Sequence, residues 1–394
     1  MSILIKRDKA IVVGKGVNAL VYINFFLALA ASIVNVVWVL IINGFVNSTV
    51  KTGIISGFFS FISFLCFFFF VPLIEKSDKR NLFAYSLIFT FFLFLFFSLN
   101  RNFYMFIFLG VLLVASYAIR ANASGILLKD NSKKKELAKN EGLIYTFLNL
   151  GWIIGPLIGA YIASKYSVYS VFIASSLFIF VALFVFSFSK FKEDRVRLVE
   201  HKDVFRNLLN YFRNKKRIIA YIIGGSATGW WILIYLFMPL FIINSGFGAK
   251  TIGLFLFLIT IPLILLEYRF GKLTQRYGYR KMFLIGSLIV FVFSVLSFFT
   301  VNIYYIFSFL ILASFGMALL EPTSDAYFLS IISRKEIDRF LGPYNTSKEI
   351  FQIIGKFLPS LALLFLPFKS VFLIFALFTL MVFLASLHIG KDEK

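Results

Sequence analysis

The most informative ionisable residues in stretches of the chain that are otherwise strongly apolar are Arg120, Glu321, Asp325 and Lys356. A charge at the centre of a membrane span costs about 2.5 to 3.5 kcal/mol on insertion scales, so such a side chain usually faces a cavity and has a partner. Glu321 and Asp325 are four residues apart and share one helix face, where two ionised carboxylates repel each other. They are therefore candidate proton sites, and Glu321, which lies deeper in its stretch, is the better one.

The elements that must position these residues are membrane spans. The chain has 394 residues, of which 60% are hydrophobic and only 15% charged, and 55 are phenylalanine. A bilayer span needs about 20 apolar residues in a helix. Twelve stretches reach this length: 18–43, 52–74, 81–99, 103–128, 142–164, 168–189, 217–243, 251–270, 282–300, 303–331, 344–366 and 370–388. This pattern excludes an ordinary soluble domain and predicts an all-α integral membrane protein with 12 transmembrane helices.

The formal net charge of +22 is a signal of topology. Of the 40 Lys and Arg residues, 32 fall in the N-terminus, the alternate loops and the C-terminus. By the positive-inside rule, both termini and those loops face the cytoplasm. We therefore expect a multi-pass protein of the cell (plasma) membrane that binds no nucleic acid. The N-terminus lacks the order of charged and apolar residues found in a cleaved signal, so the first span is expected to remain as an anchor.

The two halves of the chain repeat one plan with an offset of 200 residues, so that Gly155, for example, falls on Gly355. Halves that each contain an even number of spans share one orientation and are related by an axis along the membrane normal. We expect two pseudo-symmetric six-helix bundles, residues 1–190 and 217–394. A cytoplasmic linker over residues 191–216 joins them.

This linker is basic and amphipathic. It places five apolar residues on one helical face: Val204, Phe205, Leu208, Leu209 and Phe212. A basic helix with one apolar face is expected to lie on the inner leaflet of the membrane. We favour a simple tether between the halves over a regulatory role.

A basic turn between two apolar runs occurs in each half. The second copy, residues 271–281, reads G-K-L-T-Q-R-Y-G-Y-R-K, and the first, residues 71–80, reads V-P-L-I-E-K-S-D-K-R. Glycines permit a tight turn or a close backbone approach. The cations of the turn can bind helix-end carbonyls or acids of neighbouring spans and act as a cytoplasmic latch that holds one global state. Cations that only satisfy the positive-inside rule are the alternative.

These turns resemble the signature G-x-x-x-D-R-x-G-x-R-K of the major facilitator superfamily, found between spans two and three and between spans eight and nine. The second copy matches it at five positions, with Gln275 in place of the acid: Gly271, Arg276, Gly278, Arg280 and Lys281. In the first copy Glu75 keeps an acid, Lys76 replaces the arginine, Arg80 is retained and both glycines are lost. The resemblance implies the major facilitator fold with unequal latches, of which the second matters more.

A second resemblance to this family covers the span 142–164, which fits the pattern G-x8-G-x3-G-P-x2-G-[GA]. The matching residues are Gly142, Gly151, Gly155, Pro156, Gly159 and Ala160. In the family this pattern is associated with drug/proton antiporter-like exporters, so the resemblance favours export over import. Small residues also let helices pack closely in any membrane protein.

The family resemblance further implies that spans one, four, seven and ten line a central cavity. Candidate substrate contacts in these spans are Arg120, Asn24, Asn35, Trp230, Trp231 and Tyr235. For the two asparagines, helix–helix hydrogen bonds are an equal alternative. Lys356 in span eleven needs an anion nearby, which could be Glu321, Glu349 or an anionic substrate.

The repeat also relates the charges of the two halves. Arg120 maps onto Leu320, one residue from Glu321, so the arginine and the carboxylate lie at nearly the same depth on opposite sides of the pseudo-twofold axis. We expect them to pair when the cavity is closed to the cytoplasm and to separate when it opens there.

The sequence thus favours a monomeric secondary transporter that works by alternating access and exports a hydrophobic or amphiphilic small molecule in exchange for protons. An importer or uniporter of sugars or organic anions is the alternative, which Arg120 and Lys356 allow. A polytopic membrane enzyme or a receptor is more remote, because no set of His, Asp, Ser and Cys gathers at one interface. No metal or cofactor is expected, because Cys66 is the only cysteine and no glycine-rich phosphate loop occurs.

Overall fold

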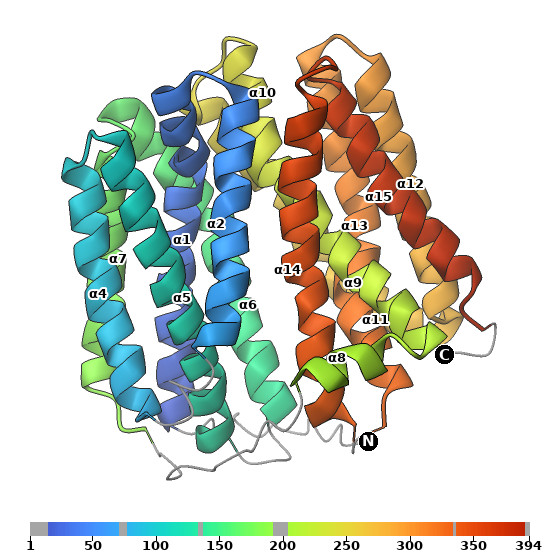
Figure 1. The fold of residues 1–394 in the computed structure, drawn as a ribbon, viewed down its shortest axis with the longest axis horizontal. Helices are drawn as coiled ribbons and strands as arrows, with labels where there is room; N and C mark the ends of the chain where they lie inside the picture. Colours follow the sequence, from blue (N-terminus) through green and yellow to red (C-terminus); the bar gives the residue numbers. More distant parts are fainter. Residues whose placement is uncertain (1–14, 71–76, 133–136, 192–203, 334–335, 391–394) are drawn as a thin grey trace, which may run out of the picture.

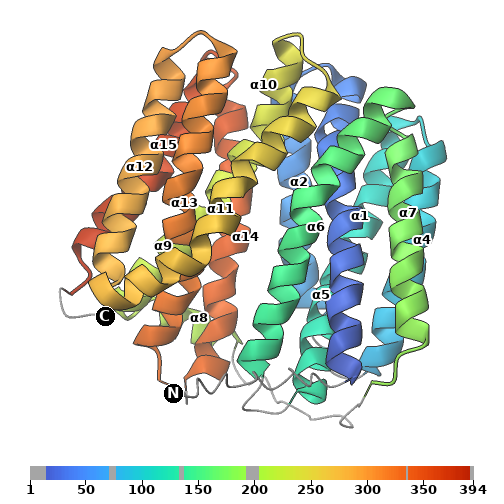
Figure 2. The same cartoon turned by 180° about the vertical axis from the view of Figure 1, so that it is seen from behind.

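The computed structural model describes residues 15–70, 77–132, 137–191, 204–333 and 336–390. Over these residues the chain is helical, and no β-strand occurs in the described part. Figure 1 shows the long helices standing side by side in two groups, and Figure 2 shows the same arrangement from behind. We call the end of the bundle at which α1 begins and α15 ends the near end, and the opposite end the far end.

Six long helices form the first half: α1 (Lys15–Val46), α2 (Thr49–Phe69), α4 (Lys79–Leu99), α5 (Phe103–Asn131), α6 (Leu137–Lys165) and α7 (Ser170–Ser187). Side-chain N-caps define where several of these helices begin, because the first backbone N–H groups of a helix need an acceptor outside the helix. The side chain of Asp78 accepts the N–H of Asn81 at 2.8 Å, and that of Asn102 accepts the N–H of Met105 at 3.1 Å.

The second half repeats this order. Its elements are α9 (Lys215–Ile232), the π-helical turn η1 (Leu233–Phe237), α10 (Met238–Asn244), α11 (Ala249–Tyr277), α12 (Tyr279–Phe299), α13 (Ile303–Ile331), α14 (Ile337–Ala362) and α15 (Ser370–Leu387). The seventh predicted span corresponds to α9, η1 and α10 in succession. The repeat extends to the caps, because Asn302, which is 200 residues after Asn102, caps α13 through the N–H of Tyr304 at 2.9 Å.

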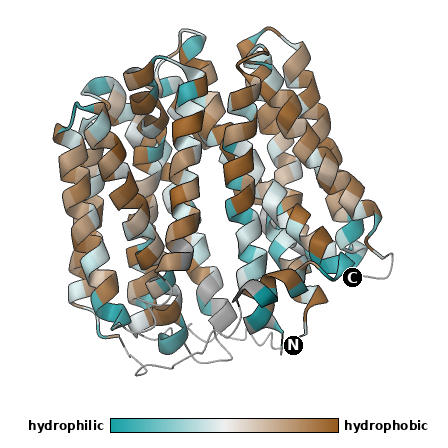
Figure 3. Cartoon of the chain, in the orientation of Figure 1, coloured by the Kyte–Doolittle hydropathy of each residue, from teal (hydrophilic) through white to brown (hydrophobic). Residues whose placement is uncertain are grey.

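Eleven of these helical segments are long and apolar enough to cross a membrane. The predicted span not among them is the eleventh, which corresponds to α14. This helix has the length of a span but carries polar side chains on one face, a stripe that we call the α14 stripe: Lys348, Glu349, Gln352 and Lys356. Figure 3 shows hydrophilic colours on α14 within the mainly hydrophobic bundle. A helix with such a stripe must turn it away from lipid.

Close helix contacts in the first half are made by the glycines of α6. A Cβ on Gly159 would lie 2.6 Å from the carbonyl oxygen of Ile33, and one on Gly151 would lie 3.0 Å from the backbone nitrogen of Leu29. The hydroxyl of Ser32 donates to the carbonyl of Gly151 at 2.9 Å. The glycine pattern of residues 142–160 therefore lets the backbones of α6 and α1 touch.

The two halves meet through two contacts that are equivalent to each other under the 200-residue repeat. A Cβ on Gly53 of α2 would lie 2.9 Å from the Cβ of Ser360 on α14. The equivalent Gly253 of α11 packs on α6, where its Cβ would lie 2.7 Å from the carbonyl oxygen of Pro156 and would also overlap Ala160, the equivalent of Ser360. These glycines lie in the far-end parts of their helices, so the halves are in close contact there.

The basic turn is shorter than predicted. Helix α11 continues to Tyr277, so Gly271 lies inside a helix, where a Cβ would meet nothing within 4 Å. A single glycine costs a helix only about 1 kcal/mol, which the flanking helical residues outweigh. Gly278 makes the turn alone, with a φ of 82° that favours glycine. Our interpretation of Gly271 as a turn residue is wrong.

The linker forms a short helix, α8 (Val204–Tyr211), that packs against the second half. Tyr211 is fully buried, and its hydroxyl donates to the carbonyl of Arg217 at 2.9 Å. Leu209 and Phe212, which belong to the predicted apolar face, are exposed. The helix is therefore held to the bundle by a residue outside that face, which leaves part of the face available to lipid.

The glycine contacts lead to a stability prediction. Replacing Gly159 by alanine should lower the melting temperature in detergent, because the new Cβ meets a backbone oxygen that cannot move independently, and overpacking of this kind costs about 1 to 3 kcal/mol. The matched control is Gly142→Ala on the same helix, where a Cβ meets nothing within 4 Å. Equal melting temperatures for the two variants would show that the α1–α6 contact is looser than described.

Candidate functional site

A cavity of about 300 Å³ lies inside the first half and is completed by α14 of the second. Its polar lining consists of Asn35, Ser60, Ser63, Thr90, Tyr117, Arg120, Gln352 and Lys356. The larger apolar side chains on its wall include Trp38, Phe59, Phe94 and Trp152. Among the described lining residues, Arg120 and Lys356 carry a formal charge and none is acidic, so the cavity is cationic.

Arg120 is held by a chain of hydroxyl groups between α4 and α5. Its Nη1 donates to the Thr90 hydroxyl at 2.8 Å, and the Thr90 and Ser116 hydroxyls are 2.9 Å apart. Both hydroxyls also bond the carbonyl of Ser86. The guanidinium has five N–H donors, so it can bind an anion while keeping this anchor. The equivalent positions of the second half carry no polar side chain: Gly286, Val290, Gly316 and Leu320.

Lys356 reaches the cavity from the other half of the protein. Its Nζ donates to the hydroxyl of Ser60 on α2 at 2.6 Å, and that hydroxyl lies 3.5 Å from Oε1 of Gln352. Its bonded partner is therefore the Ser60 hydroxyl rather than Glu321, which was one of the predicted anions. The ammonium group also interacts electrostatically with Glu349 on its own helix, another of the predicted anions. Its hydrogen-bond partner in the cavity is a neutral hydroxyl, so it can also receive an anion there.

A separate cluster joins Glu321 to aromatic side chains, and we call it the acid–aromatic cluster. The Nε1 of Trp231 donates to both carboxylate oxygens of Glu321, at 3.1 and 3.2 Å. The Trp231 ring stacks on Tyr235 with centroids 5.5 Å apart, and Tyr235 lies 5.5 Å from the ring of Trp152 in the first half. Tyr235 belongs to η1, and π-helical turns often occur at functional sites.

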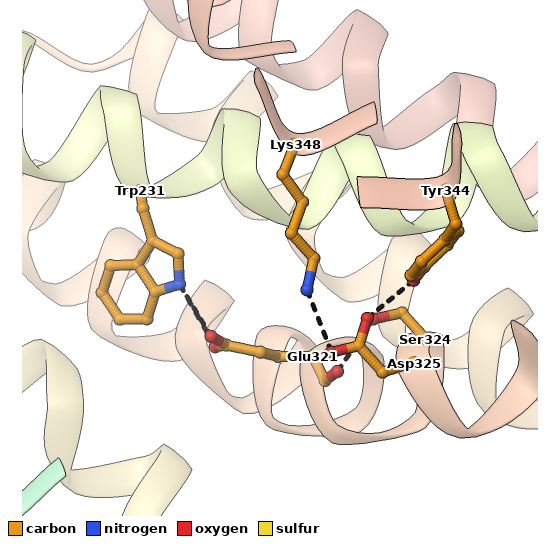
Figure 4. Close-up of polar contacts among 6 residues, drawn as sticks. All are labelled: Trp231, Glu321, Ser324, Asp325, Tyr344 and Lys348. Atoms are coloured by element: carbon orange, nitrogen blue, oxygen red, sulfur yellow. Dashed lines mark hydrogen bonds and ion pairs between the residues drawn. The ribbon is translucent and has the colours of Figure 1, made fainter. Parts of the chain in front are cut away.

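Asp325 has partners of its own, as Figure 4 shows. It accepts a hydrogen bond from the Tyr344 hydroxyl at 2.7 Å. It also forms an ion pair with Lys348, whose Nζ lies 3.0 Å from Oδ2 of Asp325. Glu321 turns instead to Trp231. The two carboxylates that share a helix face are therefore held by different helices, and Asp325 ties α13 to α14.

Of the three remaining residues predicted to contact the substrate, one lines the cavity and two lie elsewhere. Asn35 lines the cavity. Asn24 donates to the carbonyl of Leu20 on its own helix at 2.8 Å and is not among the residues that line this cavity. Trp230 is 1% exposed within the apolar core and likewise does not line the cavity. Neither Asn24 nor Trp230 lines this cavity. That they contact the substrate stays a prediction.

The latch residues lie at the near end. Arg276 is exposed, with its guanidinium 5.3 Å from the ring centroid of Tyr277, and Lys281 is exposed beside the same ring. Arg280 is half-buried in α12 and Arg80 is exposed in α4. Glu75 and Lys76 lie outside the described residues, as does the side chain of Gln275. The latch role remains a prediction.

Several cavity residues were not anticipated from the sequence. They are Ser60, Thr90, Tyr117 and Gln352, whose residue types are common in spans. One available signal was the α14 stripe, whose members recur at spacings of one, three and four and so share a helix face. Another was the repeat, because Thr90 and Ser116 have apolar or small counterparts 200 residues later.

Comparisons with known proteins agree with this architecture. The model of the Major Facilitator Superfamily matches residues 20–266 and 226–394. An uncharacterized MFS-type transporter of Methanocaldococcus jannaschii is 26% identical over 164 residues, which are 40% of this chain and 42% of that relative. The match thus spans less than half the length of that relative.

Solved structures of low sequence identity share the fold. A bacterial homolog of the human lysosomal transporter Spinster, in an inward-facing and unoccupied conformation, superposes with a TM-score of 0.75 at 13% identity, covering 96% of this chain and 98% of that one. The nucleoside transporter NupG gives 0.75 at 11% identity over 94% and 99% of the two chains. A POT family transporter bound to a thioalcohol-conjugated peptide gives 0.77 at 10% identity over 94% of each. With two pseudo-symmetric six-helix halves and a family match along nearly all of its length, this chain belongs to the major facilitator superfamily.

Proposed function

We propose that this protein is a secondary transporter of amphiphilic organic anions. The observation that carries the proposal is the pairing of Arg120 from the first half with Lys356 from the second in one cavity whose described lining has no acidic residue. Two cations in an apolar surrounding are costly unless anions compensate them, and Glu349, which interacts with Lys356, offers only one negative charge for the two. A carboxylate, sulfonate or phosphate group would satisfy both.

The wall of the cavity suits the rest of such a molecule. Trp38, Trp152 and Phe94 offer flat apolar surfaces, while Asn35 and Gln352 offer hydrogen bonds. Small-molecule sites combine a mainly apolar lining with a few polar groups that fix orientation. We therefore expect the anionic group to be attached to an aromatic or aliphatic body.

The position of the two cations suggests how binding is linked to movement. Arg120 and Lys356 belong to different halves, so an anion between them is held differently whenever the halves move. A ligand shifts a conformational equilibrium only through such a difference in binding between states. The glycine contacts described above close the far end. With cytoplasmic termini, as the charge distribution favours, this arrangement would expose the site to the cytoplasm.

A second candidate function rests on the acid–aromatic cluster. Glu321 with Trp231 and Tyr235 could bind a hydrophobic or amphiphilic cation, since aromatic faces attract cations. Together with the glycine pattern of α6, this cluster favours proton-coupled export of such compounds, with Glu321 carrying the proton. In this candidate, Arg120 and Glu321 would pair in the opposite state. In the present state Arg120 bonds Thr90, and Glu321 bonds Trp231.

The first functional prediction separates these candidates by ligand charge. Purified protein should bind naphthalene-2-sulfonate more tightly than the neutral naphthalene-2-sulfonamide. Lys356→Gln and Arg120→Gln should each weaken sulfonate binding about 10- to 100-fold, because a hydrogen bond to a charged group contributes about 1.5 to 3 kcal/mol. Isothermal titration calorimetry gives the affinities.

The matched control is Lys348→Gln, which removes a cation from the same stripe of α14. Lys348 pairs with Asp325 and does not line the cavity, so this variant should keep the affinity of the wild type. Equal binding of sulfonate and sulfonamide, or tighter binding of the corresponding naphthyl ammonium, would favour the second candidate instead.

The second prediction concerns alternating access. Asn244 Nδ2 donates to Thr49 Oγ1 at 3.3 Å across the far end. In a Cys66→Ser background, cysteines at these two positions should react with a short thiol crosslinker and hold the far end closed. Transport into proteoliposomes should then stop, while naphthalene-2-sulfonate still binds. The Thr49→Cys single variant treated with the same reagent should keep transporting, and full transport by the crosslinked pair would contradict a moving far end.

A further inference from the structure

Glu349 is a carboxylate for which the functions proposed so far have no use. It belongs to the α14 stripe, one turn from Gln352 and two turns from Lys356. Its Oε2 atom is buried and has no hydrogen-bond donor among the described residues. Glu321 and Asp325, by contrast, accept bonds from Trp231, Tyr344 and Lys348.

The electrostatic neighbours of Glu349 lie at the cavity. It interacts with Lys356 on its own helix and with Tyr117 on α5, and Tyr117 in turn interacts with Arg120. Tyr117, Arg120 and Lys356 all line the cavity. Glu349 is thus the carboxylate most closely linked to the cations of the proposed anion site.

Other ionisable groups near α14 are engaged in their own contacts. Lys348 on α14 is paired with Asp325 of α13, Glu321 of α13 is bonded to Trp231, and Tyr221 of α9 lies 3.1 Å from the Thr346 hydroxyl. Tyr211 of α8 donates to a backbone carbonyl. The described part of α2 offers Lys51 at its far end and Cys66, and the sequence of α15 contains no ionisable side chain. Arg217 of α9 lies over the ring of Phe340 on α14. The cation that interacts with Glu349 is Lys356.

We propose that Glu349 takes up a proton when an anion enters the cavity, so that the protein carries the anion and a proton together. This inference rests on the anion site proposed above. The coupled ion is then a proton, Glu349 carries it, and the anion and the proton move in the same direction.

Anion binding and proton binding are linked through the charge of Lys356. An ionised Glu349 is stabilised by the positive charge of Lys356, as two opposite charges are in a medium of low dielectric constant. A bound anion neutralises that positive charge, and a buried carboxylate left without compensation binds a proton from water. Coupling between two binding events is reciprocal, so the proton strengthens anion binding by the same factor.

The charge balance fits transport across a membrane. Uptake of one monovalent anion and one proton leaves the net charge of the site unchanged, because the carboxylate becomes a carboxylic acid as the anion binds. When the anion leaves, Lys356 again faces Glu349 and the proton is released on the same side. The anion and proton therefore move in one direction, which differs from the exchange expected from the glycine pattern of α6.

Proton uptake on binding tests the inference directly. Naphthalene-2-sulfonate stays ionised over the working pH range, so protons taken up on its binding must come to the protein. Calorimetric titrations at one pH near neutrality in two buffers of different ionisation enthalpy give the number of protons bound per anion. We expect close to one for the wild type and close to zero for Glu349→Gln, which should bind the sulfonate at least as tightly as the wild type because the amide mimics the protonated acid.

The matched control is Glu321→Gln, which removes the other deep carboxylate and should leave proton uptake unchanged. Wild type that binds the sulfonate without a proton, Glu349→Gln that still takes up a proton, or Glu349→Gln that no longer binds would each overturn the role of Glu349. Absence of sulfonate binding by the wild type would instead refute the anion site itself, so the two failures are distinguishable.

Discussion

The structure depends above all on the cost of placing charge in an apolar slab. Arg120 and Lys356 both lie in helices long enough to cross a membrane, and lipid offers neither of them a partner. The protein places the first against hydroxyl groups between α4 and α5 and the second against Ser60 across the boundary between its halves. Because the same constraint turns the stripe of α14 inward, it also favours the packing of α14 against the first half.

Close packing between the halves allows this arrangement to form. Gly53 and Gly253 occupy equivalent positions in the repeat, and each lets its helix approach a helix of the other half. The first contact lies two turns of helix from Ser60, so the approach of α2 and α14 and the bond from Lys356 belong to one interface. A movement that separates these helices would therefore also change the surroundings of the cavity. The packing of the halves and the electrostatics of the site therefore depend on the same interface between α2 and α14.

Much of the architecture followed from the sequence, because span length, charge position and the 200-residue offset are properties of single helices or of their order. The glycine pattern of α6 correctly pointed to close packing. Features that depend on helix rotation or on tertiary partners could not be read in the same way. Asn24 and Asn35 are alike in the sequence, yet one bonds its own helix and the other lines the cavity. The separate partners of Glu321 and Asp325, and the π-helical turn that carries Tyr235, depend on contacts made by distant residues.

The central claim is that one anion is held between Arg120 of the first half and Lys356 of the second. A structure of the wild-type protein determined by electron cryomicroscopy with naphthalene-2-sulfonate bound tests it most directly. The account predicts density for the sulfonate group within hydrogen-bond distance of both cations, with the naphthyl body against Trp38 or Trp152. Density against the acid–aromatic cluster of Glu321, Trp231 and Tyr235, with the cavity empty, would contradict it.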